Sequence, residues 1–334
     1  MPTVKTEVTE IVTGLATLPF ATVEEALAAR PTEIINVEVS HWDRLNDAYA
    51  GQQFHNEFTR AWSNGKSFLE AEYGLRHRTA RRVEWKGPHQ TPGYDLIPAD
   101  LRIDHVFLIS CKYLSRILFN ASPFHLFERA LATRRGTNTT DWYSHVANEA
   151  FQSFYSAVRD ELQENSLPGE VSHLSRLDRD FLKTRLSGPL SASLEDSYMS
   201  FCRSVSLASA DVWNSHLRTL RDQEEMLWRL LRLASAPYFV LGTSNTNSIR
   251  LRVYTPWDWR QEFTLEAFRV WGDQSAGQPL VRWRAIARTN SASEEFVIDG
   301  HVEVRWSHGR FSGNPEAKVY LDTPHDQVPG YAVI

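Results

Sequence analysis

The chain has 334 residues, enough for two or three domains that each bury a hydrophobic core. Hydrophobic residues make up 42% of it and charged residues 23%, as in ordinary globular proteins, and no apolar run reaches the roughly 18 residues that span a bilayer. The net charge of −5 gives no overall attraction to nucleic acid, so any polyanion site has to come from local clusters of basic residues.

Cysteine usage and the N-terminal sequence bear on the cellular compartment. Cys111 and Cys202 lie far apart in the chain, which argues against a disulfide framework and against a zinc cluster. The N-terminus lacks the basic start and the long apolar core of a secretory signal. We therefore expect a cytoplasmic protein that does not contact membranes.

The first quarter of the chain mixes helical and strand patterns. Residues 23–30 and 52–62 have the apolar spacing of helices, and the second helix is predicted to end near Asn64-Gly65. Residues 34–39 and 83–85 have the composition of strands. This order predicts a mixed α+β region.

Residues 98–113 predict a β-hairpin that turns at Asp104-His105. In that register residue 100 lies opposite residue 110, so Asp100, Ser110 and Lys112 share one face at the open end. A carboxylate and an ammonium at the mouth of a buried hairpin are costly unless they pair or bind a ligand. Alternatively, Asp100 caps the strand and Lys112 is a solvated lysine at the strand end.

The rest of the chain separates into helical and strand patterns. Residues 122–133 predict a helix with Pro123 at its first position, and residues 210–234 predict one long helix. After Tyr238 the apolar period changes from about 3.6 to 2. We therefore predict three domains, namely residues 1–136, a helical region over 137–236 and an antiparallel β-domain over 237–334.

Basic residues gather before the hairpin and on alternating positions of the predicted β-domain. They are Arg78, Arg81 and Arg82 before the hairpin, and Arg250, Arg252, Arg282 and Arg284 on two predicted strands. If those two strands are neighbours, their arginines form one basic stripe suited to phosphate contacts. The alternative is the charged solvent face that antiparallel sheets commonly have.

An order of helix, three strands and helix, with an aspartate at the second strand and a lysine ending the third, resembles the PD-(D/E)xK nuclease superfamily. The resemblance covers about residues 50–135 and implies a restriction-endonuclease-like αβββα core within residues 1–136. Asp100 matches the family's aspartate, Cys111-Lys112 its x-K, and Glu57 its helix glutamate. The family's second carboxylate falls on Ser110, which carries no charge, and Glu84 on the preceding strand is a substitute acid.

The resemblance implies a DNA endonuclease that uses Mg²⁺ or Mn²⁺, in a setting of restriction or antiphage defence. Asp100, Glu57 and the backbone carbonyl of Cys111 would hold the metal, because Mg²⁺ prefers oxygen ligands. Lys112 would stabilise developing negative charge, and Ser110 would hydrogen-bond a metal-bound water or the phosphate. Duplex DNA is the expected partner, and cutting two strands favours a homodimer.

Two other functions remain open from the sequence. The uncharged Ser110 fits a catalytically inactive nuclease fold that binds nucleic acid or a protein partner. The 11 tryptophans allow a third function, in which the β-domain binds another protein through a tryptophan-rich surface.

Overall fold

A computed structural model describes residues 3–87, 97–113, 117–129, 131, 141–243 and 248–334. The chain is α+β, with one mixed and one antiparallel sheet, as the sequence predicts. It forms two compact units. The first unit comprises residues 1–115, 232–262 and 325–334, and the second comprises residues 116–231 and 263–324.

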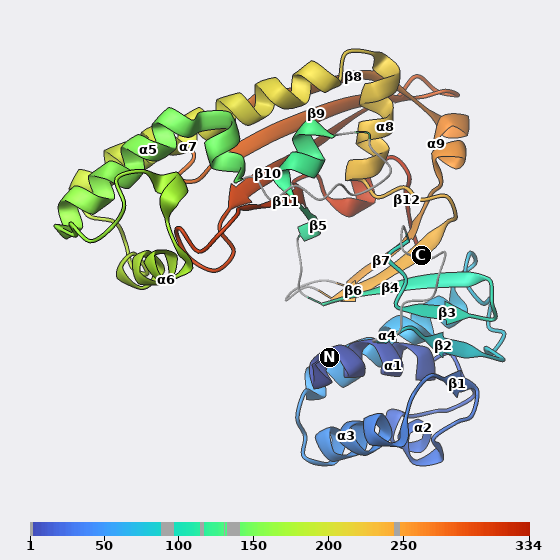
Figure 1. The fold of residues 1–334 in the computed structure, drawn as a ribbon. Helices are drawn as coiled ribbons and strands as arrows, with labels where there is room; N and C mark the ends of the chain where they lie inside the picture. The colour runs from blue at the N-terminus through green and yellow to red at the C-terminus, as the bar shows by residue number, and fades with distance from the viewer. Residues whose placement is uncertain (1–2, 88–96, 114–116, 130, 132–140, 244–247) are drawn as a thin grey trace. The chain divides into compact units, whose positions relative to one another are not determined.

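The first unit is built on a seven-stranded sheet (Figure 1). Its strands are, in spatial order, β1 (Ile34–Ile35), β2 (Val83–Trp85), β3 (Leu101–Ile103), β4 (Phe107–Tyr113), β6 (Tyr238–Thr243), β7 (Ser248–Val253) and β12 (Tyr331–Val333). The strands β2, β3 and β4 form an antiparallel meander, and β6 then pairs with β4 in parallel. The predicted hairpin therefore lies inside the sheet, with neighbours on both sides.

The helices of the first unit are α1 (Val4–Leu15), α2 (Val23–Ala29), α3 (Val39–Ala50), α4 (His55–Glu70) and α9 (Pro256–Glu262). The close packing of α1 on α4 explains an error in the predicted helix end at residues 64–65. A Cβ on Gly65 would lie 2.2 Å from the carbonyl oxygen of Thr13, so Gly65 marks the point where the two helices meet. The helix continues through it to Glu70.

The second unit has a five-stranded antiparallel sheet with helices packed against it (Figure 1). Its strands are, in spatial order, β5 (Ile117–Ala121), β11 (Glu316–Leu321), β10 (Glu295–Arg305), β9 (Leu280–Thr289) and β8 (Phe263–Gly272). Its helices are α5 (Trp142–Leu162), α6 (Arg176–Arg185), α7 (Ala192–His216) and α8 (Leu220–Leu230). Both α7 and α8 pack on β8, and α5 packs on α7. None of the described helices is long and apolar enough to cross a membrane.

This division differs from the three predicted domains. The strands β6, β7 and β12 lie within the predicted C-terminal β-domain of residues 237–334, but they extend the sheet of the hairpin. Conversely, β5 lies within the predicted first domain and pairs with β11 in the second unit. Apolar periodicity identifies a strand without identifying its partner, so the sequence pattern could not assign these strands to a sheet.

Two predicted helices also differ from the structure. The expected helix over 122–133 begins as a π-helical turn, Phe124–Glu128, and its positions 130, 132 and 133 lie outside the described residues. The expected long helix over 210–234 is interrupted at residues 217–219. Thr219 and Asp222 form a capping box there, which starts α8 as a new helix.

Candidate functional site

The hairpin has the predicted register. Leu101 pairs with Ile109, which places residue 100 opposite residue 110. Asp104 and His105 have φ values of 49° and 62°, the left-handed pair of a tight hairpin turn. The Asp104 carboxylate accepts the backbone N–H groups of residues 81 and 82 at 2.8 and 3.0 Å. Asp104 is therefore a turn residue, as predicted.

Asp100 is held in place by the strand opposite it. Its Oδ2 accepts the backbone N–H of Cys111 at 2.7 Å and the hydroxyl of Ser110 at 3.4 Å. Burial raises the pKa of Asp100, and the Cys111 N–H and the positive charge of Lys112 act against that rise. Ser110 itself is fully buried, and its hydroxyl donates to the Asp100 carboxylate.

The structure adds an acid that the sequence prediction missed. Glu10, on α1, accepts a hydrogen bond from the indole N–H of Trp85 at 2.6 Å. Burial, and next the negative charge of Asp100, raise the pKa of Glu10 to about 7, whereas Lys112 lowers it. Because the charges of Asp100 and Lys112 both act on Glu10, we treat Glu10, Asp100 and Lys112 as one group, which we call the Asp100 site.

Lys112 completes the Asp100 site from the end of β4. Burial and then the positive charge of Arg232 lower the pKa of its ammonium, whereas Asp100 and Glu10 raise it. The parallel neighbour of Lys112 on β6 is Gly242. A Cβ on Gly242 would lie 3.1 Å from the Cβ of Lys112, so the glycine leaves room for the lysine side chain.

The acids expected from the sequence have other partners. Glu57 on α4, the predicted helix glutamate, forms an ion pair with Lys5 at 3.0 Å. Glu84 lies within ion-pair distance of three basic side chains, and its pKa is lowered by its hydrogen bond with Arg102. Those three side chains are Arg82, Arg102 and His105. Glu57 and Glu84 therefore both have basic partners, whereas the helix acid on which Asp100 and Lys112 act is Glu10.

Cys111 contributes its backbone to the Asp100 site, while its side chain belongs to the core. The side chain packs against the hydrophobic core of the first unit and interacts with Thr13. Burial raises the pKa of its thiol well above the ordinary value, which disfavours a thiolate. Its backbone N–H aligns Asp100.

The arginines before the hairpin surround its turn. Arg78 lies 3.6 Å from Asp104, whose carboxylate also accepts the backbone N–H groups of Arg81 and Arg82. The side chain of Arg82 pairs with Glu84 at 3.3 Å. Two of these three predicted phosphate contacts, Arg78 and Arg82, therefore already have an acidic neighbour.

The predicted basic stripe is not continuous, because its strands belong to different sheets. Arg250 on β7 donates to Asn64 and Ser63 of α4 at 3.0 and 2.8 Å, and Arg252 on the same strand packs on tyrosine rings. The remaining arginines, Arg282 and Arg284, lie on β9 of the second unit.

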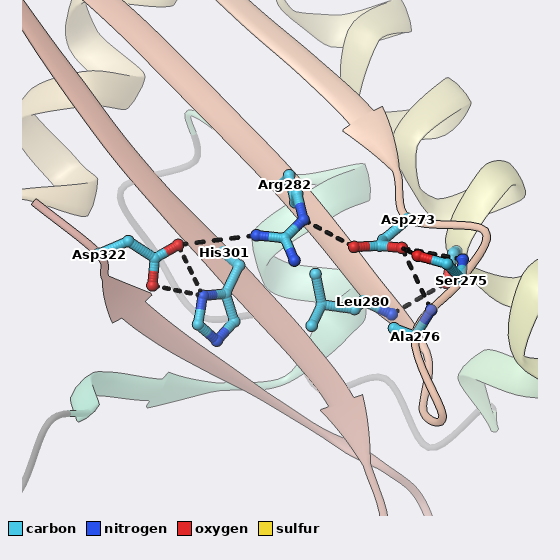
Figure 2. A network of polar contacts seen from close by, with 8 residues as sticks. Asp273, Ser275, Ala276, Leu280, Arg282, His301 and Asp322 are labelled. Atoms are coloured by element: carbon cyan, nitrogen blue, oxygen red, sulfur yellow. Dashed lines mark hydrogen bonds and ion pairs between the residues drawn. The ribbon is translucent and has the colours of Figure 1, made fainter.

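The β9 arginines face carboxylates. Figure 2 shows Arg282 between Asp273, at 2.7 Å, and Asp322, at 4.0 Å. His301 also contacts Asp322, through Nδ1 at 2.8 Å. Arg284 binds both carboxylate oxygens of Asp299 at 2.7 and 3.0 Å. The basic side chains of this face are thus paired with carboxylates of the same face. This is the pattern of the charged solvent face that antiparallel sheets commonly have.

The tryptophans of the predicted β-domain differ in their exposure. Trp259 and Trp283 are fully buried, whereas Trp257 and Trp271 are 70% and 40% exposed. Trp257 belongs to the first unit and Trp271 to the second. Of these four tryptophans, two are therefore core residues and two are exposed, one in each unit.

The Asp100 site offers a small set of oxygen donors for a divalent cation. Among the described residues, no group of three or more His, Cys, Asp and Glu side chains is arranged to hold a metal ion. Two carboxylates, Glu10 and Asp100, do interact there, and both have raised pKa values. This donor set fits Mg²⁺, which is usually bound by one or two carboxylates together with waters and substrate phosphates.

A scan against protein-family models found no match for this chain, and neither a search of curated proteins nor a search of solved structures found a similar protein.

Proposed function

We propose that the first unit is a nuclease of PD-(D/E)xK type that hydrolyses DNA with the help of Mg²⁺ or Mn²⁺. The observation that carries the proposal is the placement of Asp100 opposite Ser110, where the backbone N–H of Cys111 holds its carboxylate at 2.7 Å, two residues from Lys112 on the same strand. The charges of Asp100 and Lys112 both shift the pKa of Glu10, which hydrogen-bonds to Trp85. Buried like charges are costly, and a site that keeps two carboxylates together is suited to a cation.

The order of the elements supports the same proposal. A helix that carries Glu10 precedes the β2-β3-β4 meander, Asp100 comes directly before its second strand, and Lys112 lies near the end of its third. This is the resemblance described from the sequence, with α1 as the helix in place of α4. Where the superfamily has a helix after the third strand, the next described element after β4 is the strand β5.

Each side chain has a distinct role in the proposal. Asp100 and Glu10 would hold the cation, with the Cys111 carbonyl as a further oxygen ligand. The bound cation would polarise the phosphate and acidify a water molecule. Lys112 would donate a hydrogen bond to a phosphate oxygen and stabilise the charge that develops on it. Ser110 and the Cys111 N–H would keep Asp100 oriented.

The test is a cleavage assay on the full chain with duplex DNA, single-stranded DNA and RNA, in Mg²⁺, Mn²⁺ or EDTA. We expect DNA cleavage in either metal, none in EDTA, and loss of cleavage in Lys112→Met. Lys183→Met, which alters an exposed lysine of α6, should cleave like the wild type.

The uncharged Ser110 favours a second candidate, a nuclease fold that binds nucleic acid without cutting it. Salt-dependent DNA binding with no cleavage in either metal would support this candidate against the first. If the chain neither binds nor cleaves nucleic acid, both candidates fail.

A further inference from the structure

The first unit has an open pocket at the turn end of the β3–β4 hairpin. Its volume is about 560 Å³, a size typical of small-molecule sites. Leu75, Phe107 and Phe239 give it an apolar lining. Phe107 begins β4 and lies five residues before Lys112, or roughly 16 Å along the strand. The pocket is therefore separate from the Asp100 site.

The pocket presents an arginine whose guanidinium lies close to two aromatic rings. The guanidinium of Arg252 lies 5.3 Å from the ring centre of Tyr73 and 5.4 Å from that of Tyr254. No carboxylate of the described residues forms an ion pair with Arg252. A guanidinium near the face of an aromatic ring gains a cation–π interaction, and its planar N–H groups can still donate to a phosphate.

The charge of the lining favours an anion. Arg76, Arg78 and Arg252 line the pocket, against a single acidic residue, Glu72. The nearest carboxylate to Arg78 is that of Asp104, at 3.6 Å. The pocket thus combines an apolar surface, an exposed tyrosine and an excess of positive charge.

The wall of the pocket is fixed by close backbone contacts. A Cβ on Gly74 would lie 2.2 Å from the carbonyl oxygen of Phe68, so only glycine lets this loop fold back on the end of α4. Leu75 and His77 donate their backbone N–H groups to α4 carbonyls at 3.1 and 2.7 Å. Arg76 and His77 both have left-handed φ values, a conformation that costs energy and that the surrounding contacts maintain.

We propose that this pocket binds a nucleoside monophosphate unit, either an unpaired nucleotide of a nucleic-acid strand or a free nucleotide. The base would pack on Tyr73 and the apolar lining, and the phosphate would bind Arg252 and Arg76. Aromatic rings beside positive charge hold unpaired bases without sequence preference. The proposal rests on the pocket's own residues and does not require cleavage at the Asp100 site.

The test measures binding of a fluorescently labelled oligothymidine to the full chain in EDTA by anisotropy. Arg252→Gln and Tyr73→Ala should each weaken binding roughly tenfold, because one removes a phosphate donor and the other a stacking surface. Arg252→Lys should fall between wild type and Arg252→Gln, since it keeps the charge and loses the planar donor group. Arg30→Gln is the matched control: it removes an exposed arginine that pairs with Asp43, and binding should not change.

Competition with AMP separates the two sources of the ligand. If AMP displaces the oligonucleotide, the ligand of the pocket is a free nucleotide. If the oligonucleotide binds in an Arg252-dependent way and AMP does not displace it, the ligand is a nucleotide within a strand. The proposal is overturned if neither ligand binds, or if folded Arg252→Gln and Tyr73→Ala bind both ligands as the wild type does. A wild-type chain that binds the oligonucleotide through Arg252 but cleaves no nucleic acid in Mg²⁺ or Mn²⁺ would refute the proposed nuclease and would leave the pocket proposal standing.

Discussion

The indole N–H of Trp85 and the carboxylate of Glu10 form a 2.6 Å hydrogen bond between β2 and α1. Trp85 is fully buried, so this bond fixes the glutamate from the interior of the sheet. One helical turn earlier, Glu7 is instead neutralised by two hydrogen bonds from Arg44, at 3.1 and 2.8 Å. Of these two glutamates on α1, Glu10 is therefore the one whose pKa depends on the charges of Asp100 and Lys112.

The raised pKa of Glu10 predicts a pH dependence of stability in the cation-free protein. The carboxyl keeps its proton more tightly when folded than when unfolded, so its contribution is complete below pH 4.5 and is lost as the pH rises through about 7. The loss is at most about 3 kcal/mol, at 1.36 kcal/mol per pH unit. Denaturant unfolding at several pH values should show that the free energy of unfolding falls less with rising pH in Glu10→Gln than in the wild type. Glu24→Gln, at an exposed position of α2, should have the same pH dependence as the wild type. If the free energy of unfolding changed equally with pH in all three proteins, the pH dependence would not come from Glu10.

A divalent cation should stabilise the protein through Asp100. A ligand that binds only the folded state raises its stability by about 2.7 kcal/mol at 100 times its dissociation constant. We expect Mg²⁺ or Mn²⁺ to raise the melting temperature by a few degrees at pH 8, and by less at pH 6, where Glu10 holds a proton. Asp100→Asn should abolish the shift. A shift of the same size in Asp100→Asn would place the cation elsewhere.

Gly242 should be required for the position of Lys112. In Gly242→Ala the added Cβ meets the Lys112 Cβ at 3.1 Å, which displaces the lysine by a few tenths of an ångström. Small displacements of positioning groups are costly in catalysis, and we expect about a tenfold fall in cleavage rate. Gly188→Ala is the control because nothing lies within 4 Å of its added Cβ. Unchanged cleavage by Gly242→Ala would show that this glycine has no part in placing the lysine.

Gly65 should be essential for the packing of α1 on α4. Gly65→Ala places a methyl group 2.2 Å from the Thr13 carbonyl oxygen, a backbone atom that cannot move alone. We expect the free energy of unfolding to fall by about 3 kcal/mol, the upper range for overpacked cores. Chemical denaturation measures this loss. A stability equal to that of Gly188→Ala would contradict the close helix contact.

The sequence predicted the hairpin well because its determinants are local. The turn at Asp104-His105 and the alternation around it set the register, and the register set Asp100 opposite Ser110. Glu10 could not be found in the same way, because its partners lie 75 and 90 residues further along the chain. The buried positions 8, 11, 12 and 15 of α1 do mark a helix face. They do not show which of Glu7 and Glu10 would meet an arginine.

The sequence also could not predict which sheet each strand joins. The alternation in β7 and β9 is the same, yet β7 pairs with β6 and β12 in one sheet and β9 pairs with β8 and β10 in the other. The same limit made Gly65 look like a helix end, because its role depends on a carbonyl of a different helix.

The most direct test of the Asp100 site compares two helix glutamates in one Mg²⁺-dependent cleavage assay. Glu10→Gln should lose cleavage by at least about 100-fold, because it removes a carboxylate that would hold the cation. Glu57→Gln should stay within a few-fold of the wild type, because that glutamate pairs with Lys5. Loss of cleavage in Glu57→Gln together with normal cleavage in Glu10→Gln would contradict the account.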